Sequence, residues 1–189
     1  APSIGNTEYR QVVRGKRRKS GSRLVFSGRE MRQVAGSLSD PFRALQTLPG
    51  MSSVSALIPT PVTRGTGPNH MSIWIDGFPA PMVFHTFVGP SVIYPELLKD
   101  IAYESGDAGA EFGGQLGGVV SARTGYDSMS QRDAVEATAN LAHGGLMGRY
   151  KFDENVVFGS ARIGYPSYLI KLSGENLDVS YWDYHTQWS

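Results

Sequence analysis

The chain has 189 residues, a net charge of +1, 40% hydrophobic and 19% charged residues, and no cysteine. This length suits one ordinary domain or a small domain with an appendage, and the lack of cysteine excludes disulfides, thiolate metal sites and a cysteine nucleophile. No apolar run approaches the ~18 residues of a transmembrane helix, although membrane-spanning strands, which only alternate, are not excluded. The 23 glycines and 11 prolines favour many short strands over long helices.

The N-terminal part carries a basic cluster. Residues 1–7 are expected to form a flexible lead-in, and a start at Ala1-Pro2-Ser3 suits a chain processed by signal peptidase or a trimmed one. Six lysines and arginines lie within residues 14–23, which is compatible with a nucleic-acid arm. Because no second basic patch or aromatic platform accompanies them, we expect a solvated turn between strands at residues 8–13 and 23–26, and no nucleic-acid partner.

A helix is predicted to start at Asp40-Pro41. Asp40 can accept hydrogen bonds from the free N–H groups of the first turn, and proline is tolerated at the first helical position. One helical face is apolar, and Pro49-Gly50 ends the element. The residues on that face are Phe42, Leu45 and Leu48. Residues 51–61, rich in serine and proline, are expected to form a loop.

The middle of the chain alternates short strands with turns. Residues 73–75 are expected to form a buried strand that ends at the turn Asp76-Gly77, with Asp76 bonding its own backbone. Residues 78–90, with three prolines and several aromatics, are expected to form a loop. A second short helix is predicted over residues 95–100, and a strand over residues 101–104. The glycine-rich residues 106–118 predict tight turns before a strand at residues 119–124.

After residue 126 the pattern changes to segments of alternating polarity. Apolar residues alternate with polar ones in residues 135–141, 146–152 and 177–188, with turns between these segments. Segments of about ten residues with this alternation are typical of outer-membrane β-barrel strands. A soluble antiparallel sheet with one wet face alternates in the same way, and the period alone favours that alternative.

No catalytic motif is found in the sequence. The four histidines lie far apart and lack the spacing of metal ligands, so no metal site is expected. Nucleophile-elbow, zinc-protease and phosphate-loop motifs are missing, and we expect no enzyme and no cofactor. Arg64, between apolar and glycine neighbours, is expected to pair with a carboxylate that fixes the domain against a neighbour; an anion ligand is the alternative.

In order along the chain, five segments resemble the plug domain of outer-membrane TonB-dependent receptors. They cover most of residues 8–124. The segments are L-S-D-P-F-R-A-L-Q-T-L-P-G-M (38–51), V-T-R-G (62–65), I-W-I-D-G-F-P (73–79), F-H-T-F-V-G-P-S-V-I-Y-P-E-L-L-K-D-I-A-Y-E-S-G (84–106) and A-E-F-G-G-Q-L-G-G-V-V-S-A-R-T (110–124).

The resemblance implies an α+β plug domain, a small mixed sheet with short helices, followed by antiparallel strands of a transmembrane β-barrel. It implies a lead-in at residues 1–7, a plug at residues 8–126 and the first barrel strands at residues 127–189. The implied function is gating of energy-coupled substrate uptake in the outer membrane of a Gram-negative bacterium. The implied partners are outer-membrane lipid, a TonB-type energy-coupling protein, the rest of the barrel and an unknown substrate.

The resemblance also suggests roles for particular residues. Plug–barrel or structural locks are expected at Arg64, Gly65, Asp76, Gly77, Glu111, Gly113, Gly114 and Arg123. Substrate-facing loops are expected at residues 51–60 and 79–85, with the candidates Met51, Ser52, Ser53, Phe78, Pro79, Met82, Phe84 and His85. The position of the TonB box is taken by Glu8, Tyr9, Val12 and Val13, although the intervening Arg10 and Gln11 depart from the usual apolar-rich box.

Residues 127–189 have room for only a few strands. The resemblance implies a barrel of about 22 strands of nine to eleven residues each, and this stretch holds roughly three or four. An open sheet edge cannot lie in lipid, because its backbone groups would have no partner. Either the chain is part of a longer protein, or another chain completes the barrel. The second possibility leads to an alternative function, a non-transporting outer-membrane scaffold subunit of an envelope-spanning complex.

Overall fold

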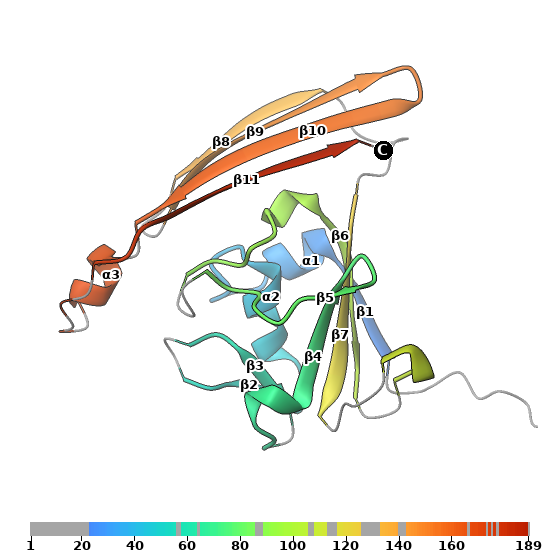
Figure 1. The fold of residues 1–189 in the computed structure, drawn as a ribbon, viewed down its shortest axis with the longest axis vertical. Helices are drawn as coiled ribbons and strands as arrows, with labels where there is room; N and C mark the ends of the chain where they lie inside the picture. Colours follow the sequence, from blue (N-terminus) through green and yellow to red (C-terminus); the bar gives the residue numbers. More distant parts are fainter. Residues whose placement is uncertain are drawn as a thin grey trace, which may run out of the picture.

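The computed structural model describes residues 23–55, 58–63, 65–85, 89–105, 108–112, 117–125, 133–139, 143–165, 167–172, 174, 176 and 178–188. These form two parts, a mixed-sheet domain up to residue 125 and a four-stranded sheet from residue 133 onward (Figure 1). None of the helices in the described ranges is long and apolar enough to cross a membrane. The expected strand at residues 8–13 and the basic cluster up to residue 22 lie outside the described residues.

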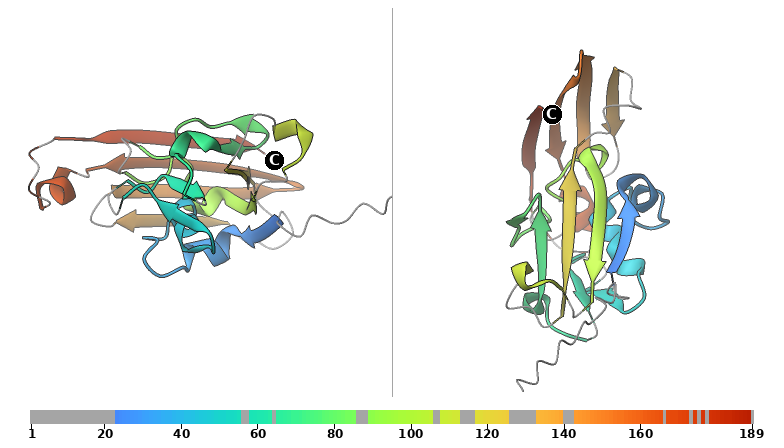
Figure 2. Two further views of the ribbon diagram at one scale, coloured as in Figure 1. Left: turned by 90° about the horizontal axis from the view of Figure 1, so that it is seen from below. Right: turned by 90° about the vertical axis from the view of Figure 1, so that its right-hand side faces the viewer.

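The mixed-sheet domain is built on five strands in the order β1-β6-β7-β4-β5. They are β1 (Arg23–Ser27), β4 (Met71–Ile75), β5 (Phe78–Pro79), β6 (Leu98–Glu104) and β7 (Gly118–Thr124). Strands β4 and β7 are parallel, whereas the other neighbours are antiparallel. Figure 2 shows these strands side by side, with β7 leading toward the second sheet. The strands expected at residues 23–26, 73–75 and 119–124 are therefore confirmed.

Two short helices pack on this sheet. Helix α2 (Pro41–Ala44) continues as the 3₁₀ helix η1 (Leu45–Thr47), and Asp40 caps it by accepting from the backbone N–H groups of Phe42 and Arg43 at 2.9 and 3.3 Å. The predicted helix start is confirmed. Helix α1 (Gly28–Arg32) was not expected, yet Ser27 and Glu30 form a capping box, whose S-x-x-E pattern is readable in the sequence.

Two segments expected to be loops contain backbone pairing between strands. Strands β2 (Met51–Ser53) and β3 (Pro61–Thr63) form a hairpin within the loop expected at residues 51–61. Residues 78–90, expected as a loop, begin with strand β5; Phe84 also bridges Ser91, just beyond the expected loop, and is a core residue rather than an exposed aromatic. Both expectations were wrong in the same way, because prolines at strand ends and edges do not prevent pairing.

The helix predicted over residues 95–100 was also wrong. Only the 3₁₀ helix η3 (Pro95–Leu97) forms, and β6 begins at Leu98, because residues 98–100 pair with β7 and with β1. Two further 3₁₀ helices occur at η2 (Pro68–His70) and η4 (Ala110–Phe112).

The four-stranded antiparallel sheet has the order β11-β10-β9-β8. Its strands are β8 (Ala134–Ala139), β9 (His143–Phe152), β10 (Asn155–Gly164) and β11 (Tyr181–Trp188), and helix α3 (Ser167–Leu172) lies between β10 and β11. Figure 1 shows this sheet lying across the mixed-sheet domain. Met147 and Phe158 of the sheet join the hydrophobic core of the domain, so the two parts share one core.

Candidate functional site

The contact between the two parts centres on two segments of the mixed-sheet domain, residues 83–85 and 89–92, called here the paired segments. They are joined by the backbone hydrogen bonds His85 N–Pro90 O (3.0 Å) and Val92 N–Val83 O (2.7 Å). The backbone N–H of Ser91 donates to Oδ2 of Asp40 at 2.6 Å, and both Ser91 and Asp40 are buried. The paired segments are thus fixed to the N-terminus of α2, inside the domain.

Asp40 therefore caps the helix and also holds Ser91. Burial raises the pKa of its carboxyl group, while the hydrogen bond from the Ser91 backbone and the charge of Arg43 act in the opposite direction. Arg43 in turn donates to the carbonyl oxygen of Gly89 at 3.1 Å, with its guanidinium 5.9 Å from the centre of the Phe84 ring. These contacts order both paired segments.

Arg162 of β10 holds the same segments from the other side. Its side chain is fully buried, and its Nη2 donates to the carbonyl oxygen of Ser91 at 2.7 Å. Its Nε donates to Oδ2 of Asp183, on the neighbouring strand β11, at 2.9 Å. The Ser91 backbone therefore links Asp40 in the domain to Arg162 in the sheet.

Asp183 makes a second contact with the paired segments. Its Oδ2 lies 2.9 Å from Nε2 of His85, and the His85 ring stacks on Tyr181 of β11, with 4.3 Å between ring centres. One carboxylate oxygen thus faces both Arg162 and His85. The two paired segments are held at two points, one on each segment.

Tyr94 adds a third point of attachment. Its ring lies 5.9 Å from the Arg162 guanidinium and 6.2 Å from the Phe158 ring, and its hydroxyl lies 3.3 Å from Oγ1 of Thr138 on β8. Burial raises the pKa of Tyr94, so its phenol stays protonated at neutral pH. Strands β8, β10 and β11 all contribute side chains to the contact.

The two faces of the four-stranded sheet differ in character. Along β11, Tyr181, Asp183, His185 and Gln187 alternate with Trp182, Tyr184 and Trp188, which are 73%, 69% and 72% exposed. Leu146 and Tyr150 of β9 and Val135 of β8 are also exposed. A soluble one-sided sheet buries its apolar face and exposes its polar face. Here many apolar side chains are exposed, and the face that meets the domain is mainly polar apart from residues such as Met147 and Phe158, which is the pattern of a barrel wall.

Asp76, an expected lock residue, does not bond its own backbone as predicted. Its carboxylate accepts from the N–H and hydroxyl of Thr124 at 2.8 and 2.6 Å, at the end of β7 where the chain leaves the domain. The prediction was wrong because Thr124 is brought alongside by the parallel pairing of β4 and β7. Asp76 and Gly77 have positive φ angles of 50° and 82°, as a tight turn requires.

Other expected lock residues lie within the mixed-sheet domain. Arg123 makes a two-pronged pair with Asp100 of the adjacent strand, at 2.8 and 2.5 Å, and its side chain is 67% exposed. This pairing raises the pKa of Arg123. Glu111 is exposed on η4, and no ion pair of Glu111 is found with any described residue. Gly65 is exposed with a φ of 71°. Arg64, Gly113 and Gly114 lie outside the described residues, as do Glu8, Tyr9, Val12 and Val13.

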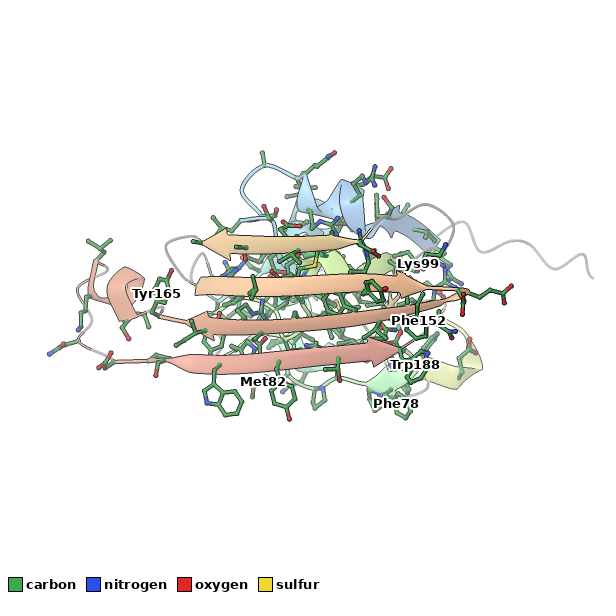
Figure 3. The ribbon with its side chains drawn as sticks, turned by 90° about the horizontal axis from the view of Figure 1, so that it is seen from above. Phe78, Met82, Lys99, Phe152, Tyr165 and Trp188 are labelled. Atoms are coloured by element: carbon green, nitrogen blue, oxygen red, sulfur yellow. The ribbon has the colours of Figure 1, made fainter. Side chains whose placement is uncertain are left out.

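The expected substrate-facing residues fall into several places. Met51 and Phe84 are buried in the core, so their side chains do not face a loop surface. Ser52 is exposed and Ser53 is half-buried, both on β2. Phe78 (74% exposed), Pro79 and Met82 (53%) are exposed, and His85 is in the contact described above. Figure 3 shows Phe78 at the end of the molecule where Phe152 and Trp188 lie, opposite to Tyr165.

In the ranges that the structure describes, no group of three or more His, Asp or Glu side chains is placed to hold a metal ion. His185 lies on the same face of β11 as Asp183, the residue that contacts His85. The arrangement is that of a mechanical contact between two structural units, held by a buried cation and a carboxylate.

Comparisons with known proteins agree with this architecture. The family model of the TonB-dependent Receptor Plug Domain matches residues 15–119, more than half of the chain. A mutant of the ferric enterobactin receptor from Pseudomonas aeruginosa has a similar structure, with a TM-score of 0.51 and 14% identity over 78% of this chain and 25% of the receptor. The FrpB iron transporter from Neisseria meningitidis has a TM-score of 0.48 and is 16% identical, over 77% of this chain and 24% of the transporter. The chain thus spans about a quarter of each of these solved structures. A search of curated proteins found no match.

Proposed function

The chain belongs to the TonB-dependent receptor plug domain family, and from this premise we propose that it is the plug-bearing part of an outer-membrane transporter that gates energy-coupled uptake of a substrate. In this proposal the mixed-sheet domain is the plug. The four-stranded sheet is the first part of the barrel wall, with its exposed apolar side chains in contact with outer-membrane lipid. The plug blocks the lumen until force applied through the N-terminal segment moves it.

The observation that carries the proposal is the attachment of the paired segments to the polar face of the sheet. Arg162 and Asp183 hold Ser91 and His85 at 2.7 and 2.9 Å. A plug must be seated against the wall to close a pore, and it must be held by contacts that can be broken. A hydrogen bond to the backbone carbonyl of Ser91 and a close polar contact with the imidazole of His85 meet both conditions.

The lengths of the connections support an orientation in the membrane. A two-residue turn, Asp153-Glu154, joins β9 to β10, whereas the connection from β10 to β11 is longer and contains α3. Bacterial outer-membrane barrels have short periplasmic turns and longer extracellular loops. The end with Phe152 and Trp188 is then periplasmic, and the end with α3 and Tyr165 is extracellular (Figure 3).

This orientation refines the candidate substrate surface. Figure 1 shows the β2–β3 hairpin reaching toward the end where α3 lies, so Ser52 and Ser53 are the better candidates for contact with an external ligand. Phe78 lies at the opposite, periplasmic end. The ferric enterobactin receptor, with a TM-score of 0.51, shares 14% identity with this chain, so the likeness supports the fold and indicates no substrate.

Coupling to a TonB-type protein can be tested at the candidate box. Val12→Cys, in the full-length protein within outer membranes, should form a disulfide with a TonB that carries a cysteine in its box-binding segment. The matched control is Ser52→Cys, at the hairpin, which should give no cross-link. Cross-linking from both positions, or from neither, would contradict energy coupling through this segment and leave the scaffold alternative to explain the fold.

A further inference from the structure

The contact between plug and wall has an unusual distribution of charge. Arg162 and Asp183 both lie on the wall, on the adjacent strands β10 and β11, and they are paired in register. The two plug groups that meet them are the backbone carbonyl of Ser91 and the imidazole of His85. The ion pair is therefore internal to the wall, and the plug is attached to it from outside.

We propose that the Arg162–Asp183 pair is a displaceable latch: it holds the paired segments of the plug in the closed state and stays paired within the wall when those segments move away. This inference rests on the proposed function, since a gate requires movement of the plug. It assigns to Arg162 and Asp183 a positioning role that none of the expected lock residues fills within the described ranges, which leave out Arg64, Gly113 and Gly114.

The physical reason lies in the penalty for unpaired buried charges. Removing one partner of a buried ion pair is strongly destabilising, because the remaining charge is left uncompensated. A plug that supplied one of the two charges would meet this penalty each time it moved. Here the Nε–Oδ2 contact of 2.9 Å between the two wall residues does not depend on the plug. Opening breaks the hydrogen bond to Ser91 and the contact with His85, and leaves the Arg162–Asp183 pair intact.

The latch holds a part of the plug that is hydrogen-bonded to the rest of the plug. The Ser91 N–H is held by Asp40 at 2.6 Å, and Ser91 is fully buried, so displacement of Ser91 is coupled to the N-terminus of α2. The ring of Tyr94 lies over the Arg162 guanidinium, and the ring of His85 stacks on Tyr181. These rings exclude water in the closed state, which strengthens the hydrogen bonds that the latch makes.

A single thiol can report the position of the latch. The chain has no cysteine, and Ser91→Cys keeps the backbone carbonyl that Arg162 binds while placing a thiol at a fully buried position. A membrane-impermeant maleimide labels this thiol only when the paired segments lift. The reporter is used in the full-length protein in outer membranes, without substrate, and the labelling rate is measured in several wall variants.

Arg162→Met should raise the labelling rate about tenfold or more, because a charge-assisted hydrogen bond to the plug is lost. Arg162→Lys should give an intermediate rate, since an ammonium cannot reproduce the two directions of the guanidinium fork. The control, Arg123→Met, breaks an exposed ion pair within the plug and should change the rate by less than about twofold.

The double variant Arg162→Met with Asp183→Asn separates latching from stability. Arg162→Met alone leaves Asp183 without its arginine partner and should lower the thermal stability of the barrel, whereas the double variant should recover stability but still label fast. Unchanged labelling in Arg162→Met, equal increases in Arg162→Met and Arg123→Met, or slow labelling in the double variant would overturn the latch. Because the labelling needs neither TonB nor substrate, its outcome is independent of the TonB cross-linking test.

Discussion

Asp76 and Thr124 are joined by two hydrogen bonds at the end of β7, where the chain leaves the mixed sheet. The carboxylate of Asp76, in the turn after β4, accepts from both the N–H and the hydroxyl of Thr124, the last residue of β7. The amide N of Asp76 donates to Ala122 O at 2.9 Å, and Gln187 Nε2 on β11 reaches the Thr124 hydroxyl at 3.5 Å. This pair therefore fixes the exit from plug to wall, which determines where the wall begins relative to the plug.

Asp76→Ala should lower the stability of the plug by about 1–3 kcal/mol, because two hydrogen bonds are lost and alanine must adopt a positive φ. Asp76→Gly should be less destabilising than Asp76→Ala, since glycine accepts this backbone conformation. Asp76→Asn should be the mildest, because asparagine keeps an acceptor and tolerates positive φ. Thermal unfolding of the full-length protein in detergent measures the series. The same loss in all three variants would contradict a role for the Thr124 contacts.

Gly118 and Gly77 share a positive φ angle but differ in the space around them, so alanine substitutions at the two positions separate backbone strain from steric clash. Both have positive φ, but a Cβ on Gly118 would lie 2.8 Å from the carbonyl oxygen of Glu104, whereas a Cβ on Gly77 meets nothing within 4 Å. Gly77→Ala should destabilise by about 1 kcal/mol from strain alone. Gly118→Ala should destabilise more, because β6 and β7 must also separate. Denaturant unfolding checks the order, and a smaller loss for Gly118→Ala would show that the strands approach less closely than the structure has them.

Glu96 should make the plug less stable as the pH rises. Burial raises the pKa of Glu96 above its ordinary value of 4.5, while the charge of Arg32 acts in the opposite direction. A carboxyl group with a raised pKa in the folded state favours the folded state below pH 4.5, and this contribution is lost as the pH rises through the raised value. Glu96→Gln should therefore increase the melting temperature at pH 7, with the difference vanishing below pH 4.5. A decrease at pH 7 would show that the Arg32–Glu96 contact, at 4.0 Å, outweighs burial.

Glu30 should show the opposite dependence. Hydrogen bonds from the Ser27 backbone and side chain lower the pKa of Glu30. Its contribution to stability is present above pH 4.5 and is lost as the pH falls through the lowered value. Glu30→Gln should lower the melting temperature at pH 7 and converge with the wild type in acid. A difference that persists at low pH would mean that the glutamine fails to cap α1 for reasons other than charge.

Local elements could be predicted from the sequence where one or two residues decide them. Asp40-Pro41 fixes a helix start by capping, and Asp76-Gly77 fixes a strand end by its backbone conformation. Helix α1 was missed although Ser27 and Glu30 carry its capping signal. The family resemblance supplied the order of the two parts, and the family model matches the first of them over residues 15–119.

The site itself could not be predicted from the sequence. Arg162 and Ser91 are 71 positions apart, and they meet only because the wall folds over the plug. The pairing of Arg162 with Asp183 depends on the register of β10 against β11, and a connection that contains α3 separates these strands. Nothing in the residues next to Arg162 distinguishes it from an exposed polar residue on a strand, so the sequence did not predict that its side chain is buried. Two residues expected as plug–barrel or structural locks, Asp76 and Arg123, bond within the plug.

The conductance of the full-length protein in a planar lipid bilayer tests most directly whether this domain closes a pore. We expect no steady conductance for the intact protein, because the plug is seated on the wall through Ser91 and His85. We expect a large, steady conductance when residues 23–125 are deleted and the barrel remains inserted. Equal conductance with and without these residues would contradict the assignment of the domain as a gate.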